Sequence, residues 1–227
     1  VNSAIYGTSN VVVNGGELAL GTTTQSVGTV TLVGGLISGT TGSLTGTSYG
    51  VENGTISAVL EGAGSLTKTT GGEVLLSGSN RYSGLTTVSA GILRLGGNDR
   101  ILSTSDATVS GGTLNLGGFS QGVATFELSS GEVVNGTLIA GSFDLRGGDV
   151  NAVLSGTGAG VKSGNGVVNL NTASEFSGGL SILSGTLRLG ASERLLDSGS
   201  VLLDGGVLDL GGGVETVGLL RLLSGSV

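Results

Sequence analysis

The side chains that could do chemistry in this sequence are mainly carboxylates. The 227 residues include seven Asp and nine Glu but no His and no Cys. The chain therefore lacks a histidine base, a cysteine nucleophile and any Cys- or His-based metal site. Pairs of carboxylates cleave glycosidic bonds or bind calcium in some β-helical enzymes. Here the acids are scattered along the chain, which predicts no catalytic residue, no metal site and no cofactor.

Two other polar features have both a functional and a structural interpretation. The turn Asn80-Arg81-Tyr82-Ser83-Gly84 could face a ligand, but we expect Tyr82 to pack its ring over a glycine corner. Lys68 and Lys162 could supply binding cations, but we expect a solvated or turn-capping role for both. The chemistry of these residues thus favours structure over catalysis.

The composition excludes several classes of protein. A net charge of −7 argues against nucleic acid, whose phosphates need a basic surface. With 37% hydrophobic and 11% charged residues, the chain is too apolar to stay disordered. It has 48 Gly but no Pro, which excludes collagen, and no apolar run reaches the roughly 18 residues of a membrane helix. No charged-then-apolar leader opens the chain, which indicates a cytosolic, processed or partial protein.

A short unit repeats along the chain and predicts its strands. TVSAGILRLG at 87–96 recurs as TVSGGTLNLG at 108–117. Each unit alternates apolar and polar residues and is punctuated by Gly, the pattern of strands of three to five residues separated by tight corners. Units of about 19–23 residues fit the rungs of a parallel β-helix, each rung being one circuit of the helix.

Alternation also predicts which side chains are buried. Leu93 and Leu95 should point inward and Arg94 outward. At the offset of the short repeat, Arg188 should lie beside Asp209 in an outward ion pair, worth roughly a few tenths of a kcal/mol.

A longer repeat, with a period of about 94–96 residues, contains the short one. The stretch 62–96 recurs at 156–190, with 13 of 35 positions identical. We interpret 1–227 as a single continuous β-helix segment and a fragment of a longer array. Its internal copies span about 11–106, 107–200 and a partial 201–227. The first copy is two residues longer than the second, and the extra residues should lie in a turn between Gly35 and Leu44.

The stretch 62–96 closely resembles the passenger-associated transport repeat, also called the autotransporter-associated β-strand repeat. The resemblance covers one repeat, at 62–96. The positions that carry it are Gly62, Gly64, Lys68, Asn80, Tyr82, Gly84, Gly91, Leu93 and Leu95. The second copy keeps the spacing but replaces Leu66 with Gly160, Asn80 with Ser174 and Tyr82 with Phe176.

This resemblance implies an all-β, right-handed parallel β-helix (β-solenoid) that is exported by the type V route and displayed on a Gram-negative-type bacterium. Its outer-membrane translocator barrel would lie outside this chain. We expect a non-enzymatic extracellular stalk or fibre with adhesive function. The expected partners are other copies of the chain, end to end or side by side, or a host or surface glycan or protein. Two alternatives stay open: a segment that assists export and folding of a passenger active elsewhere, and a β-helical carbohydrate-active enzyme.

Overall fold

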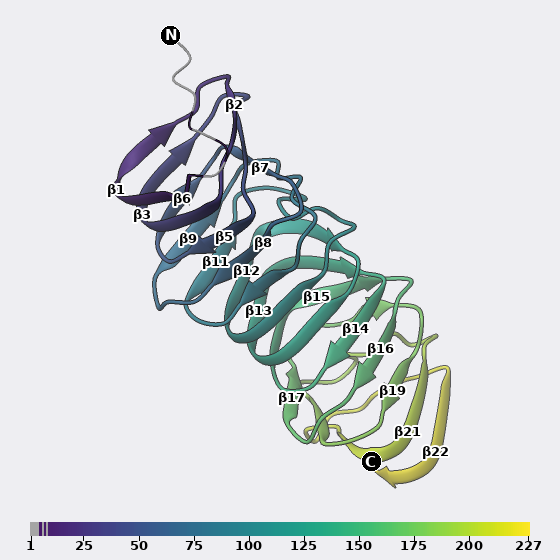
Figure 1. Cartoon of the computed structure of the whole chain (residues 1–227). Coiled ribbons are helices and arrows are strands. Elements are labelled where there is room, and N and C mark those ends of the chain that lie inside the picture. The colour runs from purple at the N-terminus through teal and green to yellow at the C-terminus, as the bar shows by residue number, and fades with distance from the viewer. Residues whose placement is uncertain (1–4, 6, 8) are drawn as a thin grey trace.

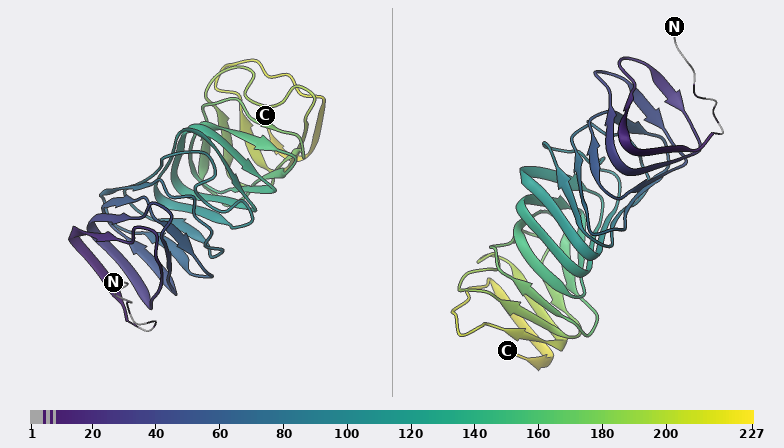
Figure 2. Two further views of the ribbon diagram at one scale, coloured as in Figure 1. Left: turned by 90° about the horizontal axis from the view of Figure 1, so that it is seen from above. Right: turned by 90° about the vertical axis from the view of Figure 1, so that its left-hand side faces the viewer.

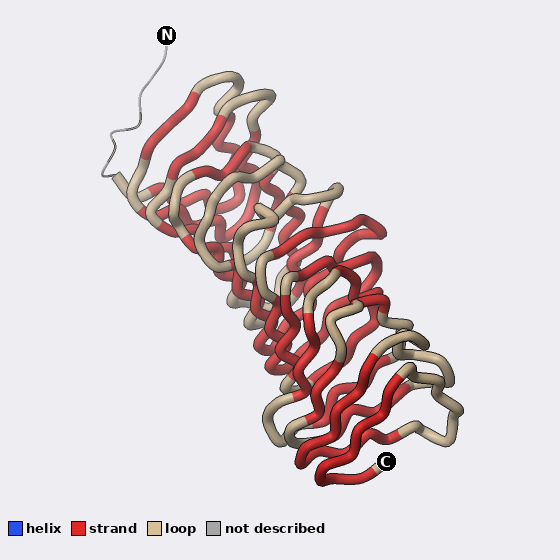
Figure 3. Tube along the Cα trace, turned by 90° about the vertical axis from the view of Figure 1, so that its right-hand side faces the viewer, coloured by secondary structure: helices blue, strands red, loops and turns tan. Residues whose placement is uncertain are grey.

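The chain winds into an elongated stack of parallel strands, which Figure 1 shows from the N-terminal to the C-terminal end. This computed structural model describes residues 5, 7 and 9–227. The predicted segment 1–227 also includes residues 1–4, 6 and 8, which lie outside the described part. All the strand pairs from β1 to β22 are parallel, and the tube in Figure 3 contains strands and loops only. The described residues thus contain no helix that could cross a membrane. The prediction of an all-β parallel solenoid is confirmed.

The structure divides the described chain into 22 strands. They are β1 (Val11–Ala19), β2 (Thr24–Ser26), β3 (Thr29–Ser38), β4 (Ser43–Thr45), β5 (Ser48–Val51), β6 (Gly54–Ile56), β7 (Val59–Glu61), β8 (Ser65–Lys68), β9 (Glu73–Leu76), β10 (Thr86–Val88), β11 (Ile92–Leu95), β12 (Ala107–Val123), β13 (Phe126–Ala140), β14 (Ser142–Leu145), β15 (Gly148–Gly156), β16 (Ala159–Lys162), β17 (Val167–Leu170), β18 (Glu175–Phe176), β19 (Leu180–Ile182), β20 (Thr186–Leu189), β21 (Ser200–Asp209) and β22 (Leu219–Ser226).

Three faces enclose the core, and Figure 2 shows the stack from two further directions. The first face contains β5, β8, β10, β14, β16 and β19, and the second contains β6, β9, β11, β17 and β20. The separate sheet β2–β4–β7 and the short strand β18 belong to a third face. The long strands β3 and β21 continue around one corner and join two faces, and β12 and β13 continue around two corners and join all three.

The length of each rung follows from one column of stacked residues on the first face. The column runs through Val11, Val30, Tyr49, Leu66 and Thr86 of the first copy and then through Ala107, where the second copy begins. It continues through Phe126, Phe143, Gly160, Leu180, Val201 and Leu220. The rungs are therefore about 17–21 residues long, and the shortest fall below the predicted range of about 19–23.

The two halves of this column differ at one place only. The step from Val30 to Tyr49 is two residues longer than the equivalent step from Phe126 to Phe143. This longer rung contains the predicted site of the extra residues between Gly35 and Leu44, where a loop at 39–42 separates β3 from β4. A surface loop therefore absorbs the length difference, as expected.

The prediction that every strand has three to five residues is wrong, because glycine lets strands bend without losing their neighbours. β12 has 17 residues and β13 has 15. At Gly131 the backbone adopts a φ of 82°, and a Cβ there would lie 2.2 Å from the carbonyl oxygen of Gly112 in the rung below. Gly148 sits in the same way on Gly131, at 2.3 Å. At this corner glycines stack directly on one another from rung to rung, and no side chain fits between them.

The core is a column of aliphatic side chains inside the three faces. Leu93 and Leu95 are completely buried, whereas the Arg94 side chain between them is 40% exposed. Leu93 stacks between Val74 and Leu114 of the adjacent rungs. The predicted inward and outward orientations are confirmed.

We predict that Leu95→Asp lowers the free energy of unfolding by roughly 4 kcal/mol, because the carboxylate would be buried without a partner. Arg94→Ala is the matched control and should cost less than about 1 kcal/mol, since it removes only a surface contact. Urea denaturation followed by far-ultraviolet circular dichroism measures both. Equal losses in the two variants would contradict the inside–outside assignment.

Candidate functional site

Both lysines of the chain lie inside the solenoid. Lys68 stacks between Val51 and Val88, and Lys162 occupies the equivalent position in the second copy. Both residues have no exposed surface. The expectation of a solvated lysine is therefore wrong, because the column that contains these residues points inward. The alternative expectation of a turn-capping lysine is confirmed.

Each ammonium group caps the glycine corner beside it. Lys162 Nζ donates to the carbonyl oxygens of Ser163 at 2.7 Å, Gly164 at 2.8 Å and Ser184 at 3.0 Å. Lys68 Nζ donates to the carbonyl oxygens of Thr70 and Ala90. Burial lowers the pKa of both lysines, and the nearby carboxylates Asp144 and Glu52 partly oppose this effect. These cations are held by the backbone and cannot serve a ligand on the surface.

The turn at 80–84 also faces inward. Asn80 is 4% exposed, and its Oδ1 accepts a hydrogen bond from Leu60 N at 2.9 Å. Its Nδ2 donates to Arg100 O at 2.8 Å, so one side chain links three successive rungs. This arrangement supports the structural interpretation of the turn over a ligand-facing one.

Aromatic rings fill the space next to this turn. Tyr82 is completely buried, its ring centroid lies 5.9 Å from that of Tyr49, and its hydroxyl is 2.7 Å from Thr86 Oγ1. The packing over a glycine that we expected of Tyr82 belongs instead to Tyr49, whose Cε1 lies 2.9 Å from where a Cβ on Gly46 would be. Burial raises the pKa of the Tyr82 hydroxyl, which therefore stays protonated.

The second copy replaces this polar pair with an apolar one. Phe176 stands in the place of Tyr82 and Leu180 in the place of Thr86, so the hydroxyl and its partner are lost together. Gly160 makes room for the new ring, since a Cβ there would lie 2.8 Å from Phe176 Cζ. The replacements at Gly160 and Phe176 are thus compensated within the core.

The remaining motif positions are corners and core. Gly62 and Gly91 have φ values of 88° and 64°, in the region that favours glycine. A Cβ on Gly84 would lie 2.6 Å from the backbone of Gly64, and one on Gly64 would lie 2.7 Å from Gly46 O. Like Leu93 and Leu95, these residues hold rungs together and form no surface site.

Two further residues, the buried Gln121 and the half-buried Glu215, have the same capping role but were not predicted. Gln121 Oε1 accepts from Ile101 N at 2.9 Å, and Gln121 Nε2 donates to Ile101 O at 2.8 Å. At the equivalent place in the partial third copy, the Glu215 carboxylate accepts from Arg194 N and Leu195 N at 2.9 and 2.7 Å. Gln121 and Glu215 are offset by one long repeat, which was the signal that could have identified them.

Carboxylates do meet on adjacent rungs, contrary to the expectation that they are scattered. Glu127 stacks directly below Asp144 on the first face, and Glu132 stacks below Asp149 on the second. Both pairs span one of the shortest rungs in the stack. The predicted rung length of about 19–23 residues is longer than these rungs and therefore does not align the carboxylates.

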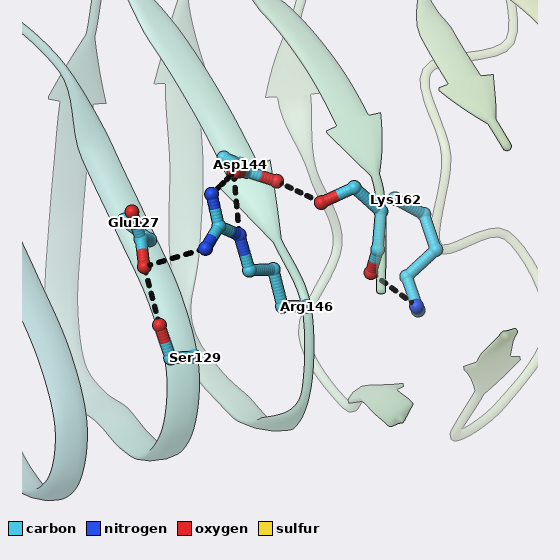
Figure 4. Close-up of polar contacts among 6 residues, drawn as sticks. Glu127, Ser129, Asp144, Arg146 and Lys162 are labelled. Atoms are coloured by element: carbon cyan, nitrogen blue, oxygen red, sulfur yellow. Dashed lines mark hydrogen bonds and ion pairs between the residues drawn. The ribbon is translucent and has the colours of Figure 1, made fainter. Parts of the chain in front are cut away.

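The first pair shares one cation. Arg146 lies 3.3 Å from Glu127 and 2.7 Å from Asp144, as Figure 4 shows. Asp144 also accepts from Ser163 Oγ, and Glu127 accepts from Ser129 Oγ. The two carboxylates raise the pKa of Arg146. This cluster is a surface network in which the arginine offsets the repulsion of stacked like charges.

The second pair is held by neutral donors. Glu132 accepts from Thr113 Oγ1 at 2.9 Å and Asn151 Nδ2 at 3.2 Å, and Asp149 accepts from Asn169 Nδ2 at 2.7 Å. The bonds form a polar ladder along the second face. Among the described residues, no group of three or more acidic side chains could hold a metal ion.

The predicted outward ion pair is confirmed. Arg188 Nε lies 2.8 Å from Asp209 Oδ2, on adjacent rungs of the second face. The hydrogen bond from Arg188, with a second from Gly211 N, lowers the pKa of Asp209.

Comparison with known proteins gives two matches. The family model described as Passenger-associated-transport-repeat matches residues 66–95 and 161–189. These ranges contain both buried lysines and seven of the nine motif positions. The chain is also 34% identical over 199 residues to a protein named "Adhesin BmaC autotransporter" from Brucella suis biovar 1 (strain 1330). The match covers 78% of this chain but 5% of that relative's length. No solved structure matches.

We predict that Tyr82→Phe lowers the free energy of unfolding by roughly 1–3 kcal/mol, because it leaves the buried Thr86 hydroxyl without its partner. Adding Thr86→Val should cost less in this background than in the wild type, since the hydroxyl removed is already orphaned. Thr87→Val, on the outer surface of the same strand, should show no coupling with Tyr82→Phe. A double-mutant cycle in urea measures these terms. If the costs of Tyr82→Phe and Thr86→Val simply add in the double variant, the hydrogen bond between the two side chains is contradicted.

We predict that Lys162→Met costs roughly 1–3 kcal/mol, because three corner carbonyls lose a charged donor. The cost should grow as the pH rises toward 10.5, the ordinary lysine pKa. Burial lowers the lysine pKa in the folded state, so in this window the unfolded chain binds more protons and the wild type gains stability with pH. Methionine does not titrate.

The difference in free energy of unfolding between Lys162→Met and the wild type, measured from pH 8 upward, isolates this effect. The tyrosines are the same in both proteins, so their contribution to the pH dependence cancels in the difference. Lys68→Met is the matched variant in the first copy and should behave in the same way. A difference that does not change with pH would contradict the lowered lysine pKa.

Proposed function

Because the chain is a segment of an autotransporter passenger with passenger-associated-transport-repeats, we propose that it is an adhesive, non-enzymatic stalk on the surface of a Gram-negative bacterium. The single observation that carries this proposal is the match of 199 residues to an autotransporter named as an adhesin. The fold supports it, since a continuous stack of rungs presents long, regular outer faces. The export route would be type V.

The outer faces supply the chemistry for contact. They carry ladders of carboxylates, amides and hydroxyls that run along the axis, such as Thr113–Glu132–Asn151 on the second face. Such surfaces suit polar partners, and we propose a host or surface glycan or protein as the ligand. The Glu127–Asp144 pair is bridged by Arg146, which favours a structural role over acid–base chemistry.

A second candidate function is favoured by the family match itself, whose description refers to passenger transport. In this alternative the segment assists export and folding, and adhesion lies elsewhere in the passenger. The chain spans about a twentieth of the length of its relative, which leaves room for other functional parts.

We predict that beads coated with the folded chain attach to epithelial cell monolayers several-fold more than beads coated with the heat-denatured chain. The denatured chain presents the same residues without the ordered faces, which makes it a matched control. Electron microscopy of the same material would reveal separate rods, or filaments if copies associate. Equal attachment of both bead types would contradict the adhesive proposal.

Deletion within a longer passenger separates the two candidates. Removing 107–200 takes out five whole rungs, so Asp106 can continue into Val201 with the stacking register kept. If the segment is an adhesive stalk, surface display should persist while attachment falls. If it assists export, the amount of passenger on the surface should fall first.

A further inference from the structure

A small cavity lies inside the second copy, between the rung that contains Phe176 and the rung that contains Leu195. Its volume is about 10 Å³, close to the space that one water molecule needs. Ser174 and Phe176 form part of its wall, and Gly199 and Ser200 lie on the side toward solvent. The cavity is distinct from the surface networks on the first and second faces.

One polar atom in the cavity wall has no hydrogen-bond partner. Ser174 is 4% exposed, and among the described residues nothing pairs with its Oγ. Its backbone N donates to Arg194 O at 2.8 Å, which holds the residue in place. A buried hydroxyl without a partner is costly, so an occupant that could pair with it would be stabilised there.

The first copy explains why the space exists. Ser174 stands where the first copy has Asn80, whose carboxamide bonds to the backbone of Leu60 and Arg100. Gly199 stands where the first copy has Ser105, whose hydroxyl donates to Tyr82 O at 3.2 Å. Both replacements remove side-chain volume and hydrogen-bonding groups from the same region.

Two more replacements change the shape of this region. Gly179 replaces Leu85, and Phe176 lacks the hydroxyl of Tyr82. Leu180 is larger than its counterpart Thr86 but brings no polar group. The second copy therefore has a space that is smaller than a side chain and contains an unpaired hydroxyl.

We propose that one water molecule binds in this cavity, in the space that the replacement of the larger Asn80 and Ser105 side chains leaves in the second copy. It accepts or donates a hydrogen bond at Ser174 Oγ, and Ser200, which lines the cavity on the solvent side, offers a second hydroxyl. This polar wall and the available volume suit one ordered internal water. The replacements that distinguish the second copy from the first thus create a hydration site in the core.

A high-resolution crystal structure of the chain tests the proposal directly. We expect a peak of water density within hydrogen-bonding distance of Ser174 Oγ. An empty cavity, or a Ser174 hydroxyl that donates to a protein acceptor, would overturn it.

Thermal unfolding of Ser174 variants gives a second test. If water pairs with the hydroxyl, Ser174→Ala lowers Tm by roughly 2–4 °C, and Ser181→Ala on the outer surface of the next strand leaves Tm nearly unchanged. Ser174→Asn restores the residue of the first copy, so it should displace the water and raise Tm. A rise in Tm for Ser174→Ala would mean that the hydroxyl is unpaired, and the proposal would fail.

Discussion

The close approach of each rung to the next is the constraint on which the rest of the structure depends. Parallel strands stack about 4.7–4.9 Å apart, and every corner must repeat at that spacing. At Gly131 and Gly148 a Cβ would overlap the backbone of the rung below, so these columns can contain only glycine. The same constraint accounts for the absence of Pro, which would remove backbone donors from every ladder that it entered.

Tight corners leave backbone groups that the strands cannot pair, and buried polar side chains satisfy them. The Lys162 ammonium group donates hydrogen bonds to three corner carbonyls, and the Asn80 and Gln121 side chains bond to the backbone of loops one rung away. Each of these side chains occupies a position that alternation alone assigns to the core. A polar residue at such a position therefore marks a corner that needs a partner, and it is not a sign of a binding site.

Much of the fold could be predicted from the sequence because alternation and glycine spacing are local. The orientation of Arg94 followed from strand alternation, and the Arg188–Asp209 pair followed from the offset of the short repeat. The stacking of Glu127 on Asp144 could not be predicted, because it depends on an unusually short rung that no local pattern reveals. The burial of Lys68 was missed for another reason: lysine is rarely buried, and the carbonyls that pair with it come together only in the folded corner.

The two copies differ in a way that indicates where function can reside. Inward positions change in compensating groups, as when Phe176 and Leu180 replace Tyr82 and Thr86, because each must fit the rungs above and below. Outward positions change independently of one another: Asn169 replaces Leu75, whereas Arg188 keeps the arginine of position 94. Stability in a solenoid is a sum over neighbouring rungs, so one imperfect rung is tolerated when its neighbours pack well. The outer ladders are thus free to vary under selection for partners, while the inner columns keep the rod in register.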